Sequence, residues 1–448
     1  MIIPQTYVWK DYEKILFRFF FIYFLLHIIP LDPLFYTHLF NIDWTGLSFS
    51  ELFNIAKYTP QFISGHYDPD NWGLATLQDW GFIFLLALTG TLIWSYIDKK
   101  NTSYTKLYAW LRILIRYRLA IAVIAYGFLK LFALQAPYPS ISSLNTPYGN
   151  FTSWKLFSLS LGIVPGYQSF LGVVELLAGI FLLFRRTATI GATIIIFFTG
   201  NVMMSNLAYE GGEAIYSLYL VTLALFLVAF DALRIVNLLV LRKPVAPARF
   251  SLALSRNNKL IFRGIKIFII SVFVVFYGFS VSRSANKGGY HFPNQTGLKG
   301  FSGLYDVASF QLNNQVLPYS TIDTVRWKDV VFEKWAAISI GVNSATPLLN
   351  EDTEKIPVTN SSNRFEESGA IGRKYYTYTA DTINHVLKLQ NDADSAQSIL
   401  FKYTLQPDSS IQLSGKINQD SVKVTLQKNN HKYLLKATEK GRRSSLKL

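Results

Sequence analysis

The chain contains no cysteine among its 448 residues. This absence excludes disulfide bonds, thiolate metal sites, covalent c-type haem attachment and a dithiol relay within the chain. Redox chemistry would therefore have to run through a bound cofactor or a partner protein. The 6 histidines also lack the HExxH-type spacing of zinc motifs, so the sequence predicts no metal site.

Charged residues are scarce at 16%, whereas hydrophobic residues make up 50% of the chain and the mean hydropathy is +0.24. This composition is too apolar for an ordinary soluble enzyme and too polar for a chain wholly inside a membrane, so we expect both kinds of domain. The net charge is +15. Most of the basic excess lies before residue 285 and is not clustered on a soluble domain, which argues against a nucleic-acid partner and for the lipid bilayer.

Seven apolar segments approach the length of about 20 residues that a helix needs to cross a bilayer. They lie at about 14–30, 78–97, 111–134, 166–184, 188–206, 214–236 and 261–281. The first segment is not followed by a small-residue cleavage site, so we interpret it as an uncleaved anchor. The sequence therefore predicts a polytopic α-helical membrane bundle of about seven spans.

Basic residues alternate between the loops that join these segments. The exterior set of loops holds only Lys57 and Lys155. The positive-inside rule then places the amino terminus in the cytoplasm, and seven crossings place everything after Val281 outside, most simply at a bacterial inner (plasma) membrane. The opposite, basic set of flanks holds Lys10, Lys14, Lys99, Lys100, Lys106, Arg112, Arg116, Arg118, Arg185, Arg186 and the stretch from Arg242 to Lys266.

A change of pattern from about Gly288 predicts an extracytoplasmic (periplasmic) all-β domain, either a barrel or a sandwich. Ser421–Lys428 alternates polar and apolar residues, and turn signals such as Asn313-Asn314 separate the short strands. The expected domains are a two-span N-terminal region with an aromatic exterior loop (1–110), a four-helix bundle (111–236), a basic cytoplasmic loop (237–260), a seventh span (261–284) and the β domain (285–448).

The segment Gly303-Leu-Tyr-Asp-Val resembles the opening strand of a lipocalin-like domain. The resemblance implies a small barrel whose interior binds an apolar ligand. The alternative is a closed β-module used for contact or spacing, because barrels of this size can be filled by their own side chains.

Two exterior loops, 31–77 and 135–165, are rich in aromatic residues and proline. Tyrosine and tryptophan favour the boundary between water and lipid, so we prefer the interpretation that these loops lie on the membrane face as a cap. The alternative interpretation is that they roof a pocket in the bundle.

Glu175 is a lone carboxylate in the apolar run Tyr167–Phe184. A carboxylate at membrane depth usually faces a partner or a cavity. Gly172 and Gly179 share its helical face and would let another helix approach closely. We therefore expect Glu175 to point into a helix bundle.

Five polar residues fall at similar depth in the outer half of three helices: Tyr126, Lys130, Glu175, Asn201 and Ser205. The leading hypothesis is that they line one polar cavity open to the outside, with Lys130 as the charged partner of Glu175. Simpler roles stay open for several of them. Lys130 can snorkel to the interface, Asn201 can bridge two helices, and Glu175 can be a structural partner of Lys130.

A family resemblance of the segment 111–236 is carried by Arg118, Tyr126-Gly-Phe-Leu-Lys130, Gly172-Val-Val-Glu175-Leu-Leu-Ala-Gly179, Leu183-Phe-Arg185-Arg186-Thr187, Gly191-Ala, Gly200-Asn201 and Asp231-Ala-Leu-Arg234. With these residues the segment resembles the DoxX-like family of four-helix membrane proteins. The resemblance implies a bundle linked to quinone-coupled or membrane-associated redox systems, including a thiosulfate–quinone reductase subunit, and it leaves the flanking spans and the β domain outside. Asp231 and Arg234, at i and i+3, are expected to pair.

The sequence is compatible with three functions. The first is a membrane component whose pocket holds a quinone-like or lipid-like molecule and which serves another membrane or periplasmic protein. The second is a catalytic quinone-linked oxidoreductase subunit, although no flavin or haem motif is visible. The third is a proton-coupled transporter, since intramembrane carboxylates are common in such proteins, although no internal repeat is evident.

Overall fold

The computed structural model divides the chain into two compact units. The first is helical and contains the described residues up to Ala136 and from Val164 to Lys287; the second contains a β-barrel together with residues 137–163. The structure describes residues 9–31, 33–63, 76–245, 255–287, 291–293, 295–349, 365–391, 394–406, 410–433 and 435. Part of the expected basic loop, 246–254, lies outside the described residues.

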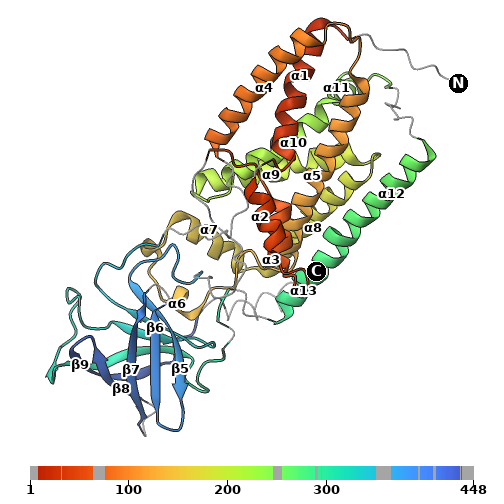
Figure 1. The fold of residues 1–448 in the computed structure, drawn as a ribbon. Helices are drawn as coiled ribbons and strands as arrows, with labels where there is room; N and C mark the ends of the chain where they lie inside the picture. The colour runs from red at the N-terminus through yellow and green to blue at the C-terminus, as the bar shows by residue number, and fades with distance from the viewer. Residues whose placement is uncertain are drawn as a thin grey trace. The chain divides into compact units, whose positions relative to one another are not determined.

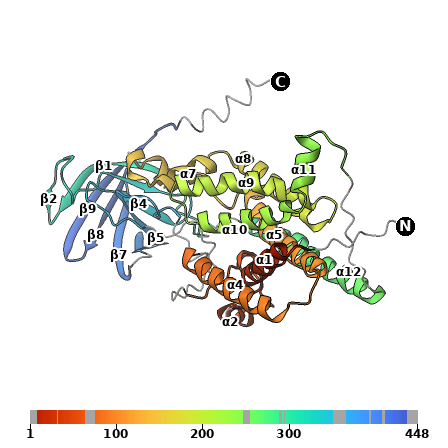
Figure 2. The ribbon, with the colours of Figure 1, turned by 90° about the horizontal axis from the view of Figure 1, so that it is seen from above.

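The helical unit is built around four helices that contact one another in a ring. α5 packs against α8 and α10, and α9 packs against both of those (Figures 1 and 2). α1 packs against α4 and α5, and α13 contacts α5. The helices are α1 (Asp11–Ile28), α2 (Pro33–Asn41), α3 (Phe49–Lys57), α4 (Leu77–Ile97), α5 (Thr105–Leu131), α8 (Pro165–Leu183), α9 (Ala188–Ala208), α10 (Ala214–Ala229), α11 (Ala232–Leu239), and α12 (Arg256–Ile270), which continues through a π-helical turn (Ser271–Phe276) into α13 (Tyr277–Lys287).

All seven apolar segments are helical, but fewer of them qualify as membrane spans than the sequence predicts. Among the described residues, 4 helices are long and apolar enough to cross a membrane: α4, α8, α9 and the continuous helix from Arg256 to Asn286. α1 and α5 carry too many charged side chains to qualify. The expected span 214–236 is broken, because α10 and α11 meet at an angle of 69°.

The break between α10 and α11 lies at Asp231. Its carboxylate accepts a hydrogen bond from Thr189 Oγ1 on α9 at 2.6 Å and pairs with Arg234 at 2.7 Å. The expected pairing of Asp231 with Arg234 is therefore confirmed. These bonds hold Asp231 against α9, and the chain turns there instead of continuing straight.

α5 and α8 approach closely because glycines line their contact. A Cβ at Gly172 would overlap the Leu131 amide nitrogen and lie 2.7 Å from the Gly127 carbonyl oxygen. A Cβ at Gly179 would lie 2.6 Å from Ile124 Cγ1. The face predicted from Gly172 and Gly179 is thus the face that packs against a second helix.

The β unit contains an eight-strand closed barrel, which settles the choice between barrel and sandwich. From β3 to β9 each strand pairs antiparallel with the next. β1 pairs with both β3 and β9, which closes the barrel, and the short β2 pairs with β1 alone. Asn313 and Asn314 both have positive φ, as a two-residue hairpin turn requires. The strands are β1 (Gly303–Leu312), β2 (Gln315–Val316), β3 (Asp329–Phe332), β4 (Ala337–Gly341), β5 (Arg373–Asp381), β6 (Val386–Asn391), β7 (Asp394–Leu405), β8 (Ile411–Ile417) and β9 (Asp420–Asn429).

Side chains of the barrel's own strands fill its interior. On β9 the alternating Val422, Val424 and Leu426 are buried, as the pattern of this segment predicts. Aromatic rings occupy much of the remaining space, including those of Phe310, Trp327, Phe332, Tyr378 and Phe401. This packing favours the closed β-module over an interior site for an apolar ligand.

Residues 137–163 belong to the barrel unit, which corrects the domain division expected from the sequence. They form α6 (Ile141–Leu144), a 3₁₀ turn (Tyr148–Asn150) and α7 (Ser153–Gly162). Thr152 N donates to Gly369 O and Ile371 N donates to Asn150 O, both at 2.9 Å. This insertion is therefore a part of the β unit, whereas the sequence placed it over the helices.

Replacement of Gly172 tests the close contact of α5 and α8. The Gly172→Ala substitution places a methyl group against backbone atoms, so we expect the free energy of unfolding to fall by about 1–3 kcal/mol. Gly200→Ala on α9 is the matched control, because nothing lies within 4 Å of its Cβ position. Thermal unfolding of the purified full-length protein in detergent compares them, and equal midpoints for the two variants would contradict the predicted contact.

Candidate functional site

Lys130 and Glu175 form a buried ion pair between α5 and α8. Lys130 Nζ lies 2.5 Å from Glu175 Oε1, and each residue is 5% exposed. The Phe198 ring of α9 lies beside the ammonium group, with its centroid 5.4 Å from Nζ. The sequence-based expectation that Lys130 reaches Glu175 therefore describes the observed contact.

The ion pair retains unused hydrogen-bonding capacity. Glu175 Oε2 is buried and has no hydrogen-bond partner among the described residues. The Lys130 ammonium carries three donors, of which one is directed at Glu175 Oε1. A small molecule that both donates and accepts hydrogen bonds would complete this arrangement.

Tyr126, one helical turn from Lys130 on α5, belongs to a second polar cluster. Its hydroxyl group donates to Glu213 Oε2 at 3.2 Å, and Glu213 also forms an ion pair with Lys57. The Glu213 amide donates to Asn206 Oδ1 at 3.3 Å. Lys57 ends α3, and its neighbour Phe53 packs on the Tyr126 ring with centroids 5.0 Å apart.

α3 is held within the helical unit by Arg118. The guanidinium group donates to the carbonyl oxygens of Ala56 and Tyr58 at the end of this helix. The C-terminal carbonyl groups of a helix lack partners within the helix and attract cations. Arg118 is thus engaged with the segment 31–77, whereas the sequence placed it among the cytoplasmic flanks. For residues 49–58 this contact favours the interpretation that the loop roofs the bundle.

Among the described residues, neither Asn201 nor Ser205 has a side-chain hydrogen bond to Lys130 or Glu175. The buried positions of α9 include Ala192, Ile195 and Thr199, and Asn201 follows Thr199 by about 200° around the helix. Asn201 is accordingly exposed and Ser205 is half-buried. The five candidate residues therefore divide into the Lys130–Glu175 pair, the Tyr126 cluster and two α9 residues outside both.

The barrel unit contains a separate group of buried polar residues, which ties the insertion to the strands. Glu333 accepts from Ser142 N and Ser142 Oγ at 2.7 Å each and from Ile141 N at 3.3 Å. It thereby pairs with amide groups in the first turn of α6. Ser142 Oγ lies 2.7 Å from Ser339 Oγ on β4.

Besides Glu333, this cluster contains two further titratable residues, Lys155 and Glu366. The Lys155 ammonium donates to Phe365 O and lies 3.7 Å from the centre of the Phe365 ring. Trp335 Nε1 donates to Glu366 Oε2 at 3.3 Å, and Oε1 is buried. Burial raises the pKa of Glu366 to about 8, with a further rise from Glu333. Burial lowers the pKa of Lys155 to about 7, against the opposing attraction of Glu366.

Two lysines that the sequence-based prediction did not include among the site residues could have been found from their position in the exterior loops. Lys57 and Lys155 are the two basic residues that break the charge pattern of the exterior loops, and both are engaged inside the structure. Their carboxylate neighbours, Glu213 and Glu366, gave no such signal. A lysine that departs from the loop-charge rule is thus a sign of a buried partner.

No protein-family model, curated protein or solved structure matches the chain.

The pH dependence of barrel stability tests the buried state of Glu366. Its pKa is higher in the folded chain than the ordinary 4.5, so stability falls as pH rises toward about 8. Lys155 acts oppositely: its pKa falls from 10.5 to about 7, so stability rises from about pH 7 to 10.5. We expect Glu366→Gln to reduce the decline below pH 7, which is at most about 1.4 kcal/mol per pH unit for one proton. Burial also raises the pKa of Glu333, so Glu333 retains part of the decline.

Hydrogen exchange of the β3 and β4 amides in the full-length protein, corrected for the intrinsic rate at each pH, measures this slope. Lys155→Met is expected to remove only the alkaline rise. Lys334→Met, at an exposed position, is the control and should keep both slopes. A decline of unchanged slope in Glu366→Gln would show that Glu366 does not contribute to it.

Proposed function

We propose that the chain is an integral membrane component whose helical unit binds the polar group of a quinone-like or lipid-like molecule at Lys130 and Glu175. Its amino terminus would lie in the cytoplasm and its barrel outside the membrane, most simply at a bacterial inner membrane. The apolar helices and the alternation of basic loops support this placement. The resemblance of residues 111–236 to the DoxX-like family, with its quinone-coupled members, agrees with it.

The unpartnered Glu175 Oε2 is the observation that carries the proposal. A buried ion pair gains little net stability, because desolvation of the two charges offsets their attraction. A buried acceptor without a partner costs about 1–3 kcal/mol more. A purely structural tie between α5 and α8 would be served as well by two apolar side chains, so a binding role accounts better for the pair.

The pair offers complementary chemistry to the two redox states of a quinone. The ammonium group of Lys130 can donate to a quinone carbonyl oxygen, and Glu175 Oε2 can accept from a quinol hydroxyl group. The Phe198 ring supplies an apolar surface beside them. A lipid head group with hydroxyl and carbonyl oxygens would meet the same donors and acceptors.

Binding of a short-chain benzoquinone analogue to the full-length protein in detergent tests the proposal. Quenching of tryptophan fluorescence measures the affinity. We expect Glu175→Gln and Lys130→Met each to weaken binding at least about tenfold, which corresponds to about 1.4 kcal/mol.

Asp231→Asn is the matched control, because it removes a carboxylate charge from a different ion pair, Asp231–Arg234 at the α10–α11 break. It should bind the analogue as the parent protein does. Thermal unfolding of each variant separates loss of binding from loss of fold. Unchanged affinity in Glu175→Gln would remove the proposed site.

Proton-coupled transport is the second candidate, favoured by the neighbouring Tyr126 cluster. Tyr126 lies one helical turn from Lys130, and its bond to Glu213 continues a series of ionisable groups to Lys57. Such series serve as proton relays in membrane carriers. Proteoliposomes with an entrapped pH indicator distinguish the two functions: proton entry that is lost in Glu213→Gln but kept in Glu175→Gln would favour transport.

A further inference from the structure

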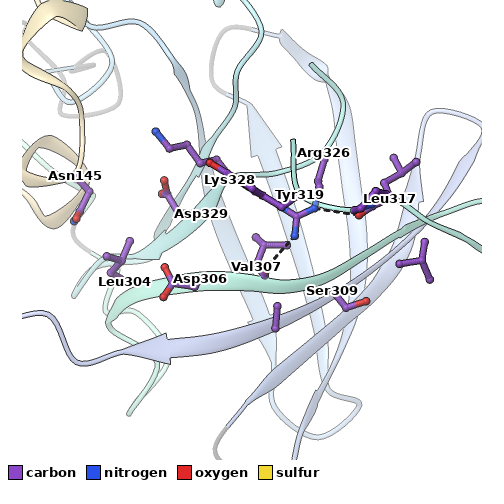
Figure 3. Close-up of a pocket in the computed structure, with 13 residues that line it drawn as sticks. Asn145, Leu304, Asp306, Val307, Ser309, Leu317, Tyr319, Arg326, Lys328 and Asp329 are labelled. Atoms are coloured by element: carbon purple, nitrogen blue, oxygen red, sulfur yellow. Dashed lines mark hydrogen bonds between the residues drawn. The ribbon is translucent and has the colours of Figure 1, made fainter. Parts of the chain in front are cut away.

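The outer wall of the barrel carries a groove that no part of the proposed membrane function uses. It has a volume of about 570 Å³ and runs along β1 and the connection that leads to β3 (Figure 3). A second hollow of about 400 Å³ continues it across β4 and β5. The two hollows share the lining residues Asn145, Lys328 and Asp329, so they adjoin one another. The first hollow is of the size that binds small ligands.

A row of residues in strand register crosses the groove. Asp306 of β1 is paired with Asp329 of β3, which is paired with Gly341 of β4, and Gly341 is paired with Arg373 of β5. Residues opposite one another on neighbouring strands point to the same face. A Cβ at Gly341 would lie 2.6 Å from Asp329 Oδ2, so the glycine leaves room for Asp329 to reach Arg373 Nη2 at 2.7 Å.

The placement of Asp306 directly opposite Asp329 does not stabilise the pairing of β1 with β3. Like charges at directly opposite positions destabilise a strand pair. Arg373 compensates Asp329, and Asn429 Nδ2 donates to Asp306 Oδ2 at 2.9 Å. The exposed Asp306 keeps its other oxygen available on the groove side. Its position is therefore better explained by a ligand than by the stability of the sheet.

The free charges of the groove balance one another. Arg326 forms its floor with a guanidinium group that already donates to the carbonyl oxygens of Leu317 and Val307 (Figure 3). The same group also donates to Trp327 O. Arg373 is engaged with Asp329. This leaves Asp306 and Lys328, of opposite sign, as the charged groups that a ligand would meet. The groove thus suits a neutral ligand with many hydrogen-bonding groups.

One side of the groove is an apolar platform. Tyr319 is 61% exposed and its ring centre lies 5.3 Å from the Arg326 guanidinium carbon, which orients the ring. Pro318 and Leu317 flank it. At the other side, Asn145, Asp306, Lys328 and Asp329 offer carboxylate, amide and ammonium groups (Figure 3).

We propose that this groove binds a neutral carbohydrate, a sugar unit or a short oligosaccharide. Sugars combine an apolar face of C–H groups, which packs on an aromatic ring, with hydroxyl groups that hydrogen-bond to carboxylates and amides in pairs. Tyr319 supplies the platform, and Asp306 and the Asn145 Oδ1 acceptor supply the polar contacts. The Asn145 Nδ2 group already donates to Ile141 O and Tyr433 Oη. The part along β4 and β5 provides room for a second sugar unit.

Titration calorimetry of the full-length protein with N-acetylglucosamine, glucose and their β-1,4-linked dimers and trimers tests the proposal. We expect saturable binding to at least one of these probes, tighter for the longer oligomers. Tyr319→Ala and Asp306→Ala should each weaken it at least about tenfold. Tyr319→Phe, which keeps the ring, should bind as the parent does.

Ile322→Ala is the control for the same connection, because Ile322 is 88% exposed and does not line the groove. It should leave binding unchanged. Absence of saturable binding to every saccharide probe would overturn the proposal. So would binding that Tyr319→Ala and Asp306→Ala leave intact, or binding of a neutral tripeptide in place of the saccharides.

Discussion

Close packing of α5 against α8 is the constraint on which the helical unit's buried charges depend. The backbones meet at Gly172, where no larger residue fits against Leu131 and Gly127. Lys130 is adjacent to Leu131 in the chain, and Glu175 follows Gly172 by three residues. The glycine contact therefore sets the separation at which the two charges meet. A wider spacing would leave both charges buried and unpaired, which is strongly destabilising.

The same need for partners explains how the loop segments are placed. Arg118 donates hydrogen bonds to the carbonyl groups at the end of α3, and Lys57 forms an ion pair with Glu213. In the barrel unit, Lys155 donates a hydrogen bond to Phe365 O, and Glu333 accepts hydrogen bonds from backbone amides of α6. Each segment is fixed by a charged side chain whose burial is acceptable only with that partner. Hydrophobic packing alone would leave the position of such short helices less defined.

Local pattern in the sequence predicts the helices, the alternating strands and the buried orientation of Glu175. Residues on one helix face are a fixed number of positions apart, so Gly172 and Glu175 could be assigned together. The depth of a residue along its helix gives its level in the bundle and not the direction in which its side chain points. Asn201 has a suitable depth but faces away from the buried side of α9.

Contacts between distant segments could not be predicted in this way. Ser142 and Glu333 are 191 positions apart, and no periodicity links them. For this reason the sequence placed residues 137–163 over the helices instead of in the barrel unit. The break at Asp231 has a similar origin, since it depends on Thr189 of another helix.

A continuous series of hydrogen bonds connects the interior of the barrel unit with the outer groove. It runs from Glu333 through Ser142 and Ser339 to Arg373, whose Nε donates to Ser339 Oγ at 3.0 Å. The ion pair between Arg373 and Asp329 then extends it to the groove. Neighbouring hydrogen bonds polarise one another in a low-dielectric interior. The groove's polar wall is thus held by the same residues that tie the insertion to the strands. Such a wall is ordered before any ligand arrives, and that order reduces the entropy lost on binding.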